Sequence, residues 1–240
     1  MKLLAPWRLL EASMHEDFNA SVLPFQSGIA DPSLAEFALP QIYLPIKRTL
    51  DIALTIAVGP IALLIVLLLA AVVALDGHAP FYCQPRLGKA GRHFRLWKLR
   101  SMVQGAEGKL SDYLAANPTA REEWDRTQKL QHDPRITPVG RLMRKYSLDE
   151  LPQLWNVLRG DMSLVGPRPM FPEQRSIYPG SDYFSLRPGI TGLWQVTARN
   201  KSSFAERAIY DSEYAHRLSA ATDVRILILT PIVMLRGTGA

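Results

Sequence analysis

The sequence predicts a mainly helical α+β protein that is bound to a membrane. Three observations predict this fold class: a long uncharged apolar run, two short extended segments around a glycine-containing turn, and several segments of helical composition. The chain has 240 residues, of which 48% are hydrophobic and 21% are charged. This composition is typical of a chain that folds around a core, so disorder is excluded for most of it.

The charge balance and the cysteine count limit the function classes. The net charge is +6 and the pI is about 9.5, which suits nucleic acid, an anionic membrane surface or a phosphorylated substrate as a partner. Cys83 is the only cysteine, so no internal disulfide can form. The five histidines are scattered with no pair at ligand spacing, which excludes a zinc-type cluster.

The apolar run extends over 24 residues, from Ile52 to Leu75, and contains no charge. A straight helix of this length reaches about 36 Å, enough to cross a bilayer core of about 30 Å. The run starts too far from Met1 and is too long for a secretory signal. Gly59 and Pro60 lie within it, and because Pro60 removes a backbone hydrogen bond, we expect a kink there.

Cationic residues flank the run on both sides, with Lys47 and Arg48 before it and six lysines and arginines between residues 86 and 100 after it. Because such flanks favour the cytoplasm, both ends are expected on the same side of the membrane. A re-entrant helix that enters, turns at Gly59-Pro60 and returns satisfies this rule. A kinked spanning helix remains the alternative from these features alone.

The rest of the chain divides by composition. We expect a weakly structured arm over 1–46, a membrane helix over 47–76 and a folded domain over 77–240. Within the domain we expect a hairpin over 79–100, with strands at Phe81–Cys83 and His93–Leu99 and a turn at Pro85–Gly91. Helices are expected over 105–131 with a break at Pro118, over 139–159 with an interruption near Pro152, and over 202–218 and 224–235, the last in the core or at the membrane interface. A long loop rich in proline and glycine fills 160–192.

Two adjacent carboxylates, Asp149 and Glu150, form the strongest chemical feature. Pro152 suits the first position of a helix that Gly160 would close, so both acids would stand at its positive end. That position, with Arg144 and Lys145 nearby, favours their ionised form. An ionised carboxylate can bind Mg²⁺ or attack phosphorus. The alternative is structural, since Ser147-Leu-Asp-Glu150 also matches a capping box.

Two arginines lie next to rigid turns and are candidates for phosphate binding. Arg168 stands between two prolines after Gly166, and Arg187 precedes Pro-Gly. Guanidinium groups match phosphate geometry, although a plain surface turn explains the position of Arg168 equally well. The sequence contains neither a P-loop nor a G-x-G-x-x-G motif, so phosphate binding would rest on arginines, a metal and helix ends.

Several long motifs in order resemble the monotopic phosphoglycosyl transferases, the bacterial sugar transferase family, over about residues 46–236. They comprise Lys47-Arg48 with Asp51, the Gly-Pro in the apolar run, Arg95-Leu-Trp-Lys-Leu-Arg-Ser-Met102, Asp133-Pro-Arg-Ile-Thr137, Ser147-Leu-Asp-Glu-Leu-Pro-Gln-Leu154, Gly160-Asp-Met-Ser-Leu-Val-Gly-Pro-Arg-Pro169 and Arg187-Pro-Gly-Ile-Thr-Gly-Leu-Trp-Gln195. The stretch from Tyr113 to Trp124 is similar to exopolysaccharide-initiating galactose-phosphate transferases. Gly59 departs from the serine that many members have before the proline.

The resemblance implies a two-step transfer of a hexose 1-phosphate from a UDP-sugar to polyprenyl (undecaprenyl) phosphate. Asp149 matches the nucleophile, which releases UMP and carries the phosphosugar. Glu150 matches the second member of the dyad, which assists Mg²⁺ binding or proton handling, so both acids are candidate ligands of a Mg²⁺ cofactor. The candidate phosphate-binding residues are Lys98, Arg100, Arg144, Arg168 and Arg187.

The resemblance also implies a monotopic protein of the bacterial inner membrane. Its kinked re-entrant helix would have both ends cytoplasmic, and amphipathic helices would lie at the interface beside a cytoplasmic catalytic domain. We expect no nucleic-acid partner, and a homodimer is one candidate assembly. The sugar is left open between galactose, glucose and an N-acetylhexosamine. The rival functions are a membrane-anchored basic module that binds lipid or nucleic acid without catalysis and a structural scaffold of an envelope complex.

Overall fold

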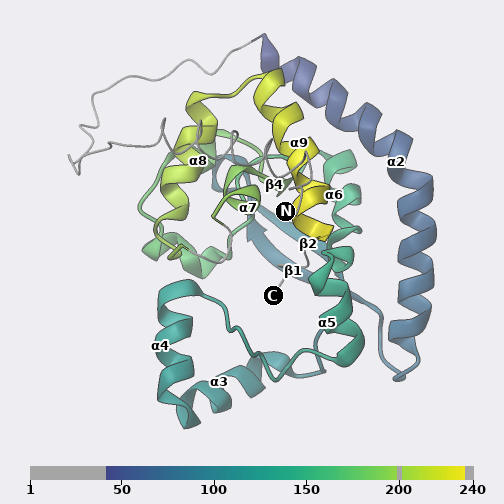
Figure 1. The fold of residues 1–240 in the computed structure, drawn as a ribbon, viewed down its shortest axis with the longest axis vertical. Coiled ribbons are helices and arrows are strands. Elements are labelled where there is room, and N and C mark those ends of the chain that lie inside the picture. The colour runs from purple at the N-terminus through teal and green to yellow at the C-terminus, as the bar shows by residue number, and fades with distance from the viewer. Residues whose placement is uncertain (1–41, 199–201, 236–240) are drawn as a thin grey trace, which may run out of the picture. The chain divides into compact units, whose positions relative to one another are not determined.

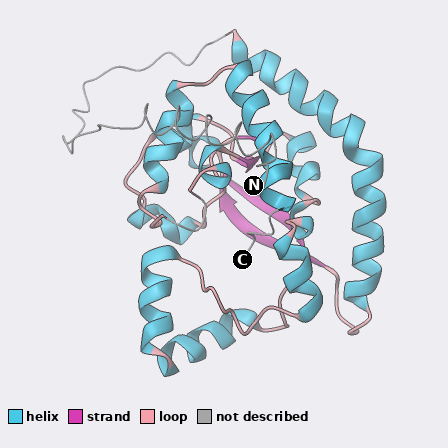
Figure 2. Cartoon of the chain, in the orientation of Figure 1, coloured by secondary structure: helices cyan, strands magenta, loops and turns pink. Residues whose placement is uncertain are grey.

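The computed structural model describes residues 42–198 and 202–235. In this part of the chain helices predominate, and the strands form two small pairs (Figure 2). Most of the arm predicted over 1–46 lies outside the described residues, but Tyr43 to Ile46 already belong to a helix. The helices of at least seven residues are α2 (Tyr43–Ala74), α3 (Ala106–Ala116), α4 (Pro118–Thr127), α5 (Pro138–Lys145), α6 (Gln153–Arg159), α8 (Arg207–His216) and α9 (Ala220–Leu235).

The apolar run forms α2, a single helix of 32 residues that contains Pro60. Figure 1 shows α2 bent about midway along its length. A proline inside a helix cannot donate to the carbonyl four residues earlier, and its ring pushes on the preceding turn, so a bend is expected there. The helix is therefore bent, as predicted, but its backbone continues through the bend.

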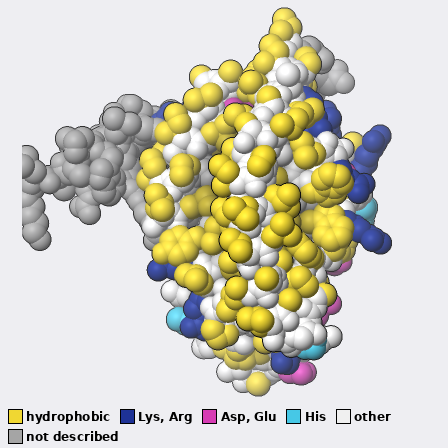
Figure 3. Space-filling model, turned by 90° about the vertical axis from the view of Figure 1, so that its right-hand side faces the viewer, with side chains coloured by type: hydrophobic (Ala, Val, Ile, Leu, Met, Phe, Trp, Pro, Cys, Tyr) yellow, Lys and Arg dark blue, Asp and Glu magenta, His cyan; other side chains and the backbone are white. Residues whose placement is uncertain are grey.

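One face of α2 is buried along the whole helix and the rest is apolar and exposed. The buried side chains recur at helical spacing and face the rest of the domain: Lys47, Asp51, Thr55, Ala62, Val66, Ala70 and Val73. Figure 3 shows hydrophobic side chains on the outward side, with lysines and arginines at the margins. By length and composition α2 is the one helix of the described chain that could cross a membrane, and an 18-residue stretch of it has a mean hydropathy of 3.0.

Both ends of α2 are fixed to the same folded body. Near its start, Lys47 Nζ lies 2.6 Å from Asp223 Oδ2 of α9, and the Ser163 hydroxyl donates to Asp51 Oδ2 at 2.7 Å. Just after its end, Arg100 Nη2 lies 2.6 Å from Asp76 Oδ1 and donates to the Val73 carbonyl at 3.1 Å. The beginning and the end of the apolar helix therefore attach to one domain.

A β-hairpin follows α2 and lies in the middle of the domain (Figure 1). Strand β1 (Phe81–Leu87) pairs antiparallel with β2 (His93–Leu99). The predicted second strand is confirmed, but the predicted turn from Pro85 was wrong, since β1 continues to Leu87 and the 3₁₀ turn η1 (Lys89–Gly91) closes the hairpin. Pro85 is tolerated because a two-stranded sheet has only edge strands, which need no donor on the outer side.

Two polar helices, α3 and α4, follow the hairpin, and Pro118 separates them as predicted. The next helical region is also interrupted as predicted, by the 3₁₀ turn η2 (Leu148–Glu150). Gly160 ends α6 with φ of +86°, a left-handed conformation that favours glycine. The capping-box alternative for Ser147 was wrong, because Ser147 has φ of +54° and its side chain makes no capping hydrogen bond.

The stretch over 160–192 is more ordered than the expected loop. It contains β3 (Ser163–Val165) and β4 (Gly189–Thr191), which pair in parallel, and the 3₁₀ turns η3 (Pro172–Ile177) and η4 (Asp182–Ser185). A Cβ at Gly189 would lie 2.1 Å from the Gly166 nitrogen, so the two chains approach closely. The short helix α7 (Leu193–Val196) was not predicted, and α8 is shorter than the predicted 202–218.

Candidate active site

The two acids lie on η2, between α5 and α6. Leu148 and Leu151, which border Asp149 and Glu150, pack against a buried cluster of α2, β2 and α5 side chains: Val66, Ala70, Val73, Leu99 and Met143. The positive φ of Ser147 turns the chain sharply before the acids. The apolar contacts therefore hold the carboxylate pair at the junction of the hairpin and the second half of α2.

Asp149 is buried, with 4% of its surface exposed. Burial raises the pKa of Asp149, the nearby charge of Lys98 opposes this shift, and the charge of Glu150 adds to it. We expected the helix end and Lys145 to favour the ionised form, but burial is the largest effect and acts in the opposite direction. Lys145 instead lies over the ring of Tyr146, at 5.4 Å. The cations around Asp149 are therefore needed to keep it ionised.

Glu150 binds two of the predicted cations. Its Oε1 accepts from Lys98 Nζ at 2.7 Å and from Arg168 Nη2 at 3.3 Å. Lys98 Nζ is also 3.9 Å from Asp149 Oδ2. The structure therefore brings Lys98 and Arg168, two of the candidate phosphate-binding residues, together with the two acids.

Arg144 reaches the same site from the last turn of α5. Its Nε donates to the Ser101 hydroxyl at 2.9 Å, and its charge lowers the pKa of Asp149. The helix is held against the chain after β2 because Gly140 has no side chain. A Cβ there would lie 1.9 Å from the Ser101 carbonyl oxygen. The close approach of α5 at Gly140 thus positions Arg144.

Arg168 lies on the Gly-Pro-Arg-Pro loop after β3, and this loop is held by its backbone. Gly166 N donates to the Thr191 carbonyl at 2.9 Å, and Gly189 N donates to the Pro167 carbonyl at 2.8 Å. Behind the loop, Arg207 Nη2 donates to the Arg168 carbonyl at 2.5 Å. These bonds fix the backbone from which the Arg168 guanidinium extends toward Glu150.

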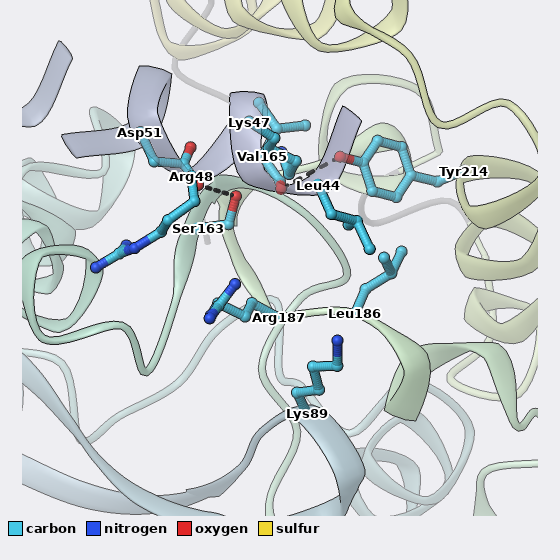
Figure 4. Close-up of a pocket in the computed structure, with 10 residues that line it drawn as sticks. All are labelled: Leu44, Lys47, Arg48, Asp51, Lys89, Ser163, Val165, Leu186, Arg187 and Tyr214. Carbon is cyan, nitrogen blue, oxygen red and sulfur yellow. Dashed lines mark hydrogen bonds between the residues drawn. The ribbon is translucent and has the colours of Figure 1, made fainter. Parts of the chain in front are cut away.

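Arg187 and Arg100, two of the predicted phosphate-binding residues, make their hydrogen bonds away from the acids. Arg187 Nε donates to the Gly160 carbonyl at 2.9 Å, at the end of α6 opposite the acids. Figure 4 shows its guanidinium in a pocket beside the first turns of α2, with Lys89 and Arg48 among the lining residues. Arg100 binds Asp76 and the carbonyl groups near the end of α2. The phosphate-binding role of both arginines stays a prediction, and these contacts favour a structural one.

The sequence reasoning did not single out several polar residues of this region. Asn156 is fully buried and ties α6 to β2, since its Nδ2 donates to the Arg95 carbonyl at 2.7 Å and its Oδ1 accepts from Trp97 N at 3.1 Å. Arg86 and Arg207 lie close enough to Arg168 for its charge to lower the pKa of each. An asparagine in an apolar helix was a usable signal for Asn156. Arg86 was counted only among the basic residues after the apolar run, and Arg207 carried no signal, because only the tertiary fold brings the two to Arg168.

The donor set fits one role for Mg²⁺. Among the described residues no three histidine, cysteine or acidic side chains converge as a metal cage. Asp149 and Glu150 offer adjacent carboxylates, and Mg²⁺ is commonly bound by one or two carboxylates together with water and substrate phosphates. The pair therefore suits a metal that shares its coordination with a phosphorylated ligand.

The arrangement defines a class of site: two adjacent acids, one of them deeply buried, among three cations beside a long apolar helix. Such a site can bind a polyanion and bring a carboxylate to it. Lys98, Arg100 and Arg144 are each paired within the domain, whereas Lys89, Arg92 and Arg95 are exposed. A basic lipid- or nucleic-acid-binding module, the rival hypothesis, would have to use these exposed cations.

Comparison with known proteins identifies the family. The bacterial sugar transferase model matches residues 42–237. The chain is 45% identical over 197 residues to the undecaprenyl-phosphate galactose phosphotransferase of Salmonella typhimurium. This match covers 81% of the present chain and 41% of the Salmonella protein. The same figures apply to the UDP-galactose-lipid carrier transferase of Erwinia amylovora. The present chain is also 42% identical over 187 residues to the exopolysaccharide production protein ExoY of Rhizobium meliloti, and this match covers 77% of the present chain and 83% of ExoY.

The chain therefore belongs to the bacterial sugar transferase family. It spans 41% of the length of the Salmonella and Erwinia relatives and most of ExoY. The apolar helix and the family together identify a membrane-associated protein.

Proposed function

We propose that this protein transfers a hexose 1-phosphate from a UDP-sugar to polyprenyl phosphate and releases UMP, as the first membrane step of exopolysaccharide or glycoconjugate synthesis. The observation that carries the proposal is the position of Asp149, a buried carboxylate next to Lys98, Arg144 and Arg168. Relatives named as galactose and glucose phosphotransferases of undecaprenyl phosphate support the lipid acceptor and a galactose or glucose donor.

In the first step, ionised Asp149 attacks the β-phosphorus of the UDP-sugar. The bond between this phosphorus and the bridging oxygen breaks, and UMP leaves with that oxygen. The phosphosugar stays on Asp149 as an acyl phosphate. Lys98, Arg144 and Arg168 support this step because an anionic nucleophile can approach a pyrophosphate only where cations neutralise the charge.

In the second step, an oxygen of the lipid phosphate attacks the same phosphorus and Asp149 leaves as a carboxylate. Glu150 holds Lys98 and Arg168 in place through its hydrogen bonds. A Mg²⁺ ion held by Asp149 and Glu150 would supply further charge neutralisation on the phosphates. The covalent intermediate removes the need to bind a soluble nucleotide and a membrane lipid at once.

We further propose that α2 enters the cytoplasmic leaflet and returns to the same side. The support is that Lys47 and Asp51 near its start, and Asp76 after its end, all bind the same domain. Exposed apolar side chains on neighbouring helices would lie at the same surface: Val139, Leu142, Trp155 and Leu158. The domain then faces the cytoplasm, where UDP-sugars are made, and the acids lie close to the acceptor lipid.

The test is UMP release by purified Asp149→Asn protein, given a panel of UDP-sugars and polyprenyl phosphate. We expect UMP release to fall by at least about 1,000-fold, since no carboxylate is left to attack. Mass spectrometry of quenched wild-type protein should find a phosphosugar on residue 149, and the variant should have none. Asp112→Asn on exposed α3 is the matched control and should retain wild-type activity. Full activity of the Asp149 variant would reject the mechanism.

A further inference from the structure

Arg86 is a cation of β1 without an acidic hydrogen-bond partner among the described residues. Its Nη2 donates to the amide oxygen of Gln84 at 3.1 Å, and its guanidinium lies over the ring of Phe171 at 3.3 Å. Its Nε is buried and has no hydrogen-bond partner in the described part of the chain. The face of the Phe171 ring attracts the cation, but it cannot accept a hydrogen bond from the Nε–H, which lies in the plane of the guanidinium. The buried guanidinium therefore has one hydrogen-bond donor that no described group satisfies.

The charges around Arg86 are mostly positive. Burial, together with the charges of Arg168 and Arg207, lowers the pKa of Arg86 to about 9, while Tyr183 and Glu150 oppose this shift. Arg207 in turn is close to Asp211, which offsets part of its charge. Like charges gathered in a buried place are unfavourable unless an anion joins them. The excess of positive charge therefore indicates a site that an anionic ligand completes.

The cluster of Arg86, Arg168 and Arg207 lies next to Asp149 and Glu150. Side chains alternate between the two faces of a hairpin, and the register pairs Arg86 with Phe94, four residues before Lys98. Arg86 and Lys98 therefore share a face, with their strand positions about 13 Å apart. Arg168 links them, because its Nη2 touches Glu150 and its charge acts on Arg86. Arg168 is therefore close both to the acids and to Arg86.

We propose that Arg86 and Arg168 form a single phosphate subsite beside Asp149, which holds the phosphate of the departing UMP and later the phosphate of the incoming polyprenyl lipid. The proposal rests on the two-step transfer proposed above and assigns a residue and a shared ligand site to it. Arg207 is a positioning residue, since it binds the Arg168 carbonyl from behind.

The geometry of phosphoryl transfer gives the reason for sharing. The attacking and leaving oxygens lie roughly in line on opposite sides of phosphorus. In the first step Asp149 attacks and the UMP oxygen leaves on the far side. In the second step the lipid phosphate oxygen attacks from that same far side, the new P–O bond forms, and the bond to Asp149 breaks. Both partners are phosphate monoesters, so one set of arginines suits both.

The test measures equilibrium binding of UMP to detergent-solubilised full-length protein carrying Asp149→Asn, in which no covalent step interferes. Adding Arg86→Gln should raise the Kd for UMP at least tenfold. Arg86→Lys should raise it less, because an ammonium keeps the charge but not the fork of donors. The matched control is Arg95→Gln, an exposed arginine on the other face of the hairpin, which should change the Kd less than twofold.

A second measurement tests the sharing itself. A short-chain polyprenyl phosphate should displace UMP from the same protein, and Arg86→Gln should weaken lipid and nucleotide binding by similar factors. An unchanged Kd for UMP in the Arg86→Gln protein, or simultaneous binding of UMP and lipid phosphate, would overturn the proposal. These binding results do not depend on turnover. A failure of the transfer itself would instead appear as absent UMP release and absent adduct in the wild type.

Discussion

Lys98 Nζ lies 2.7 Å from Glu150 Oε1 and 3.9 Å from Asp149 Oδ2. The ammonium group therefore binds one acid directly and acts on the other through its charge. Because burial raises the pKa of Asp149 and Lys98 is the largest opposing influence, this lysine controls how readily Asp149 ionises. These contacts of Lys98 connect β2 of the hairpin to η2.

Lys98→Met should shift the pH dependence of the first step. Without the ammonium the pKa of Asp149 rises further, so a higher pH is needed to ionise it and the acidic limb of the UMP-release profile moves upward. Single-turnover rates between pH 5 and 9 measure this shift, and we expect at least a tenfold loss near pH 7. Lys145→Met, an exposed lysine of α5, is the control and should leave the limb in place. If the rate of UMP release falls equally at every pH and the acidic limb does not move, the electrostatic role of Lys98 would be contradicted.

Asp211 predicts a pH-dependent stability. Burial raises its pKa to about 6, while Arg207 and the hydroxyl of Tyr178 oppose the shift. A carboxyl with a raised pKa is more protonated in the folded than in the unfolded state, so its contribution declines as the pH rises from about 4 to above 6. The stability of Asp211→Asn relative to wild type should therefore increase over this range, by up to about 3 kcal/mol. Unfolding in detergent at pH 4.5 and 7.5 tests this, and an unchanged difference would refute it.

Lys47 of α2 and Asp223 of α9 form a buried ion pair, in which Lys47 Nζ lies 2.6 Å from Asp223 Oδ2. Lys47→Met should destabilise the protein by about 3–5 kcal/mol, because it leaves Asp223 buried without its cation. The double variant with Asp223→Asn should recover part of this loss, since the hydroxyl groups of Tyr43 and Tyr214 donate to different carboxylate oxygens. In asparagine one hydroxyl can still donate to the amide oxygen and the other can accept from the amide N–H. Thermal unfolding in detergent measures both. Equal losses in the single and double variants would contradict the unpaired Asp223 carboxylate as the cause of the loss.

The topology of α2 can be tested by labelling single cysteines at positions 45 and 80 in a Cys83→Ser background. A re-entrant helix places both positions in the cytoplasm, so a membrane-impermeant reagent should label neither in intact cells and both after permeabilisation. Pro60→Leu should straighten the helix and favour a spanning form, in which one position becomes accessible. Labelling of position 45 alone in the unmodified helix would defeat the re-entrant model.

The local features of this fold follow from residue order. The long apolar run, Pro118 between α3 and α4, and Gly160 at the end of α6 each act through the chain beside them, so their positions were predictable. The β3–β4 pair was not, because its strands have three residues each and are joined by a parallel register between distant segments. The extension of β1 through Pro85 also depended on its partner strand.

The sequence by itself determined the apolar helix with its bend, the hairpin and the adjacent carboxylates with their nearby Arg144. These features depend on hydrophobic length, backbone geometry and spacing within a few residues. Only the tertiary structure decided which distant cations meet the acids: Lys98 and Arg168 reach Glu150, Arg86 lies close to Arg168, and Arg187 binds at the far end of α6. The physical reason is that burial and charge proximity are properties of the packed chain, so the pKa of Asp149 is set by neighbours that its own segment does not contain.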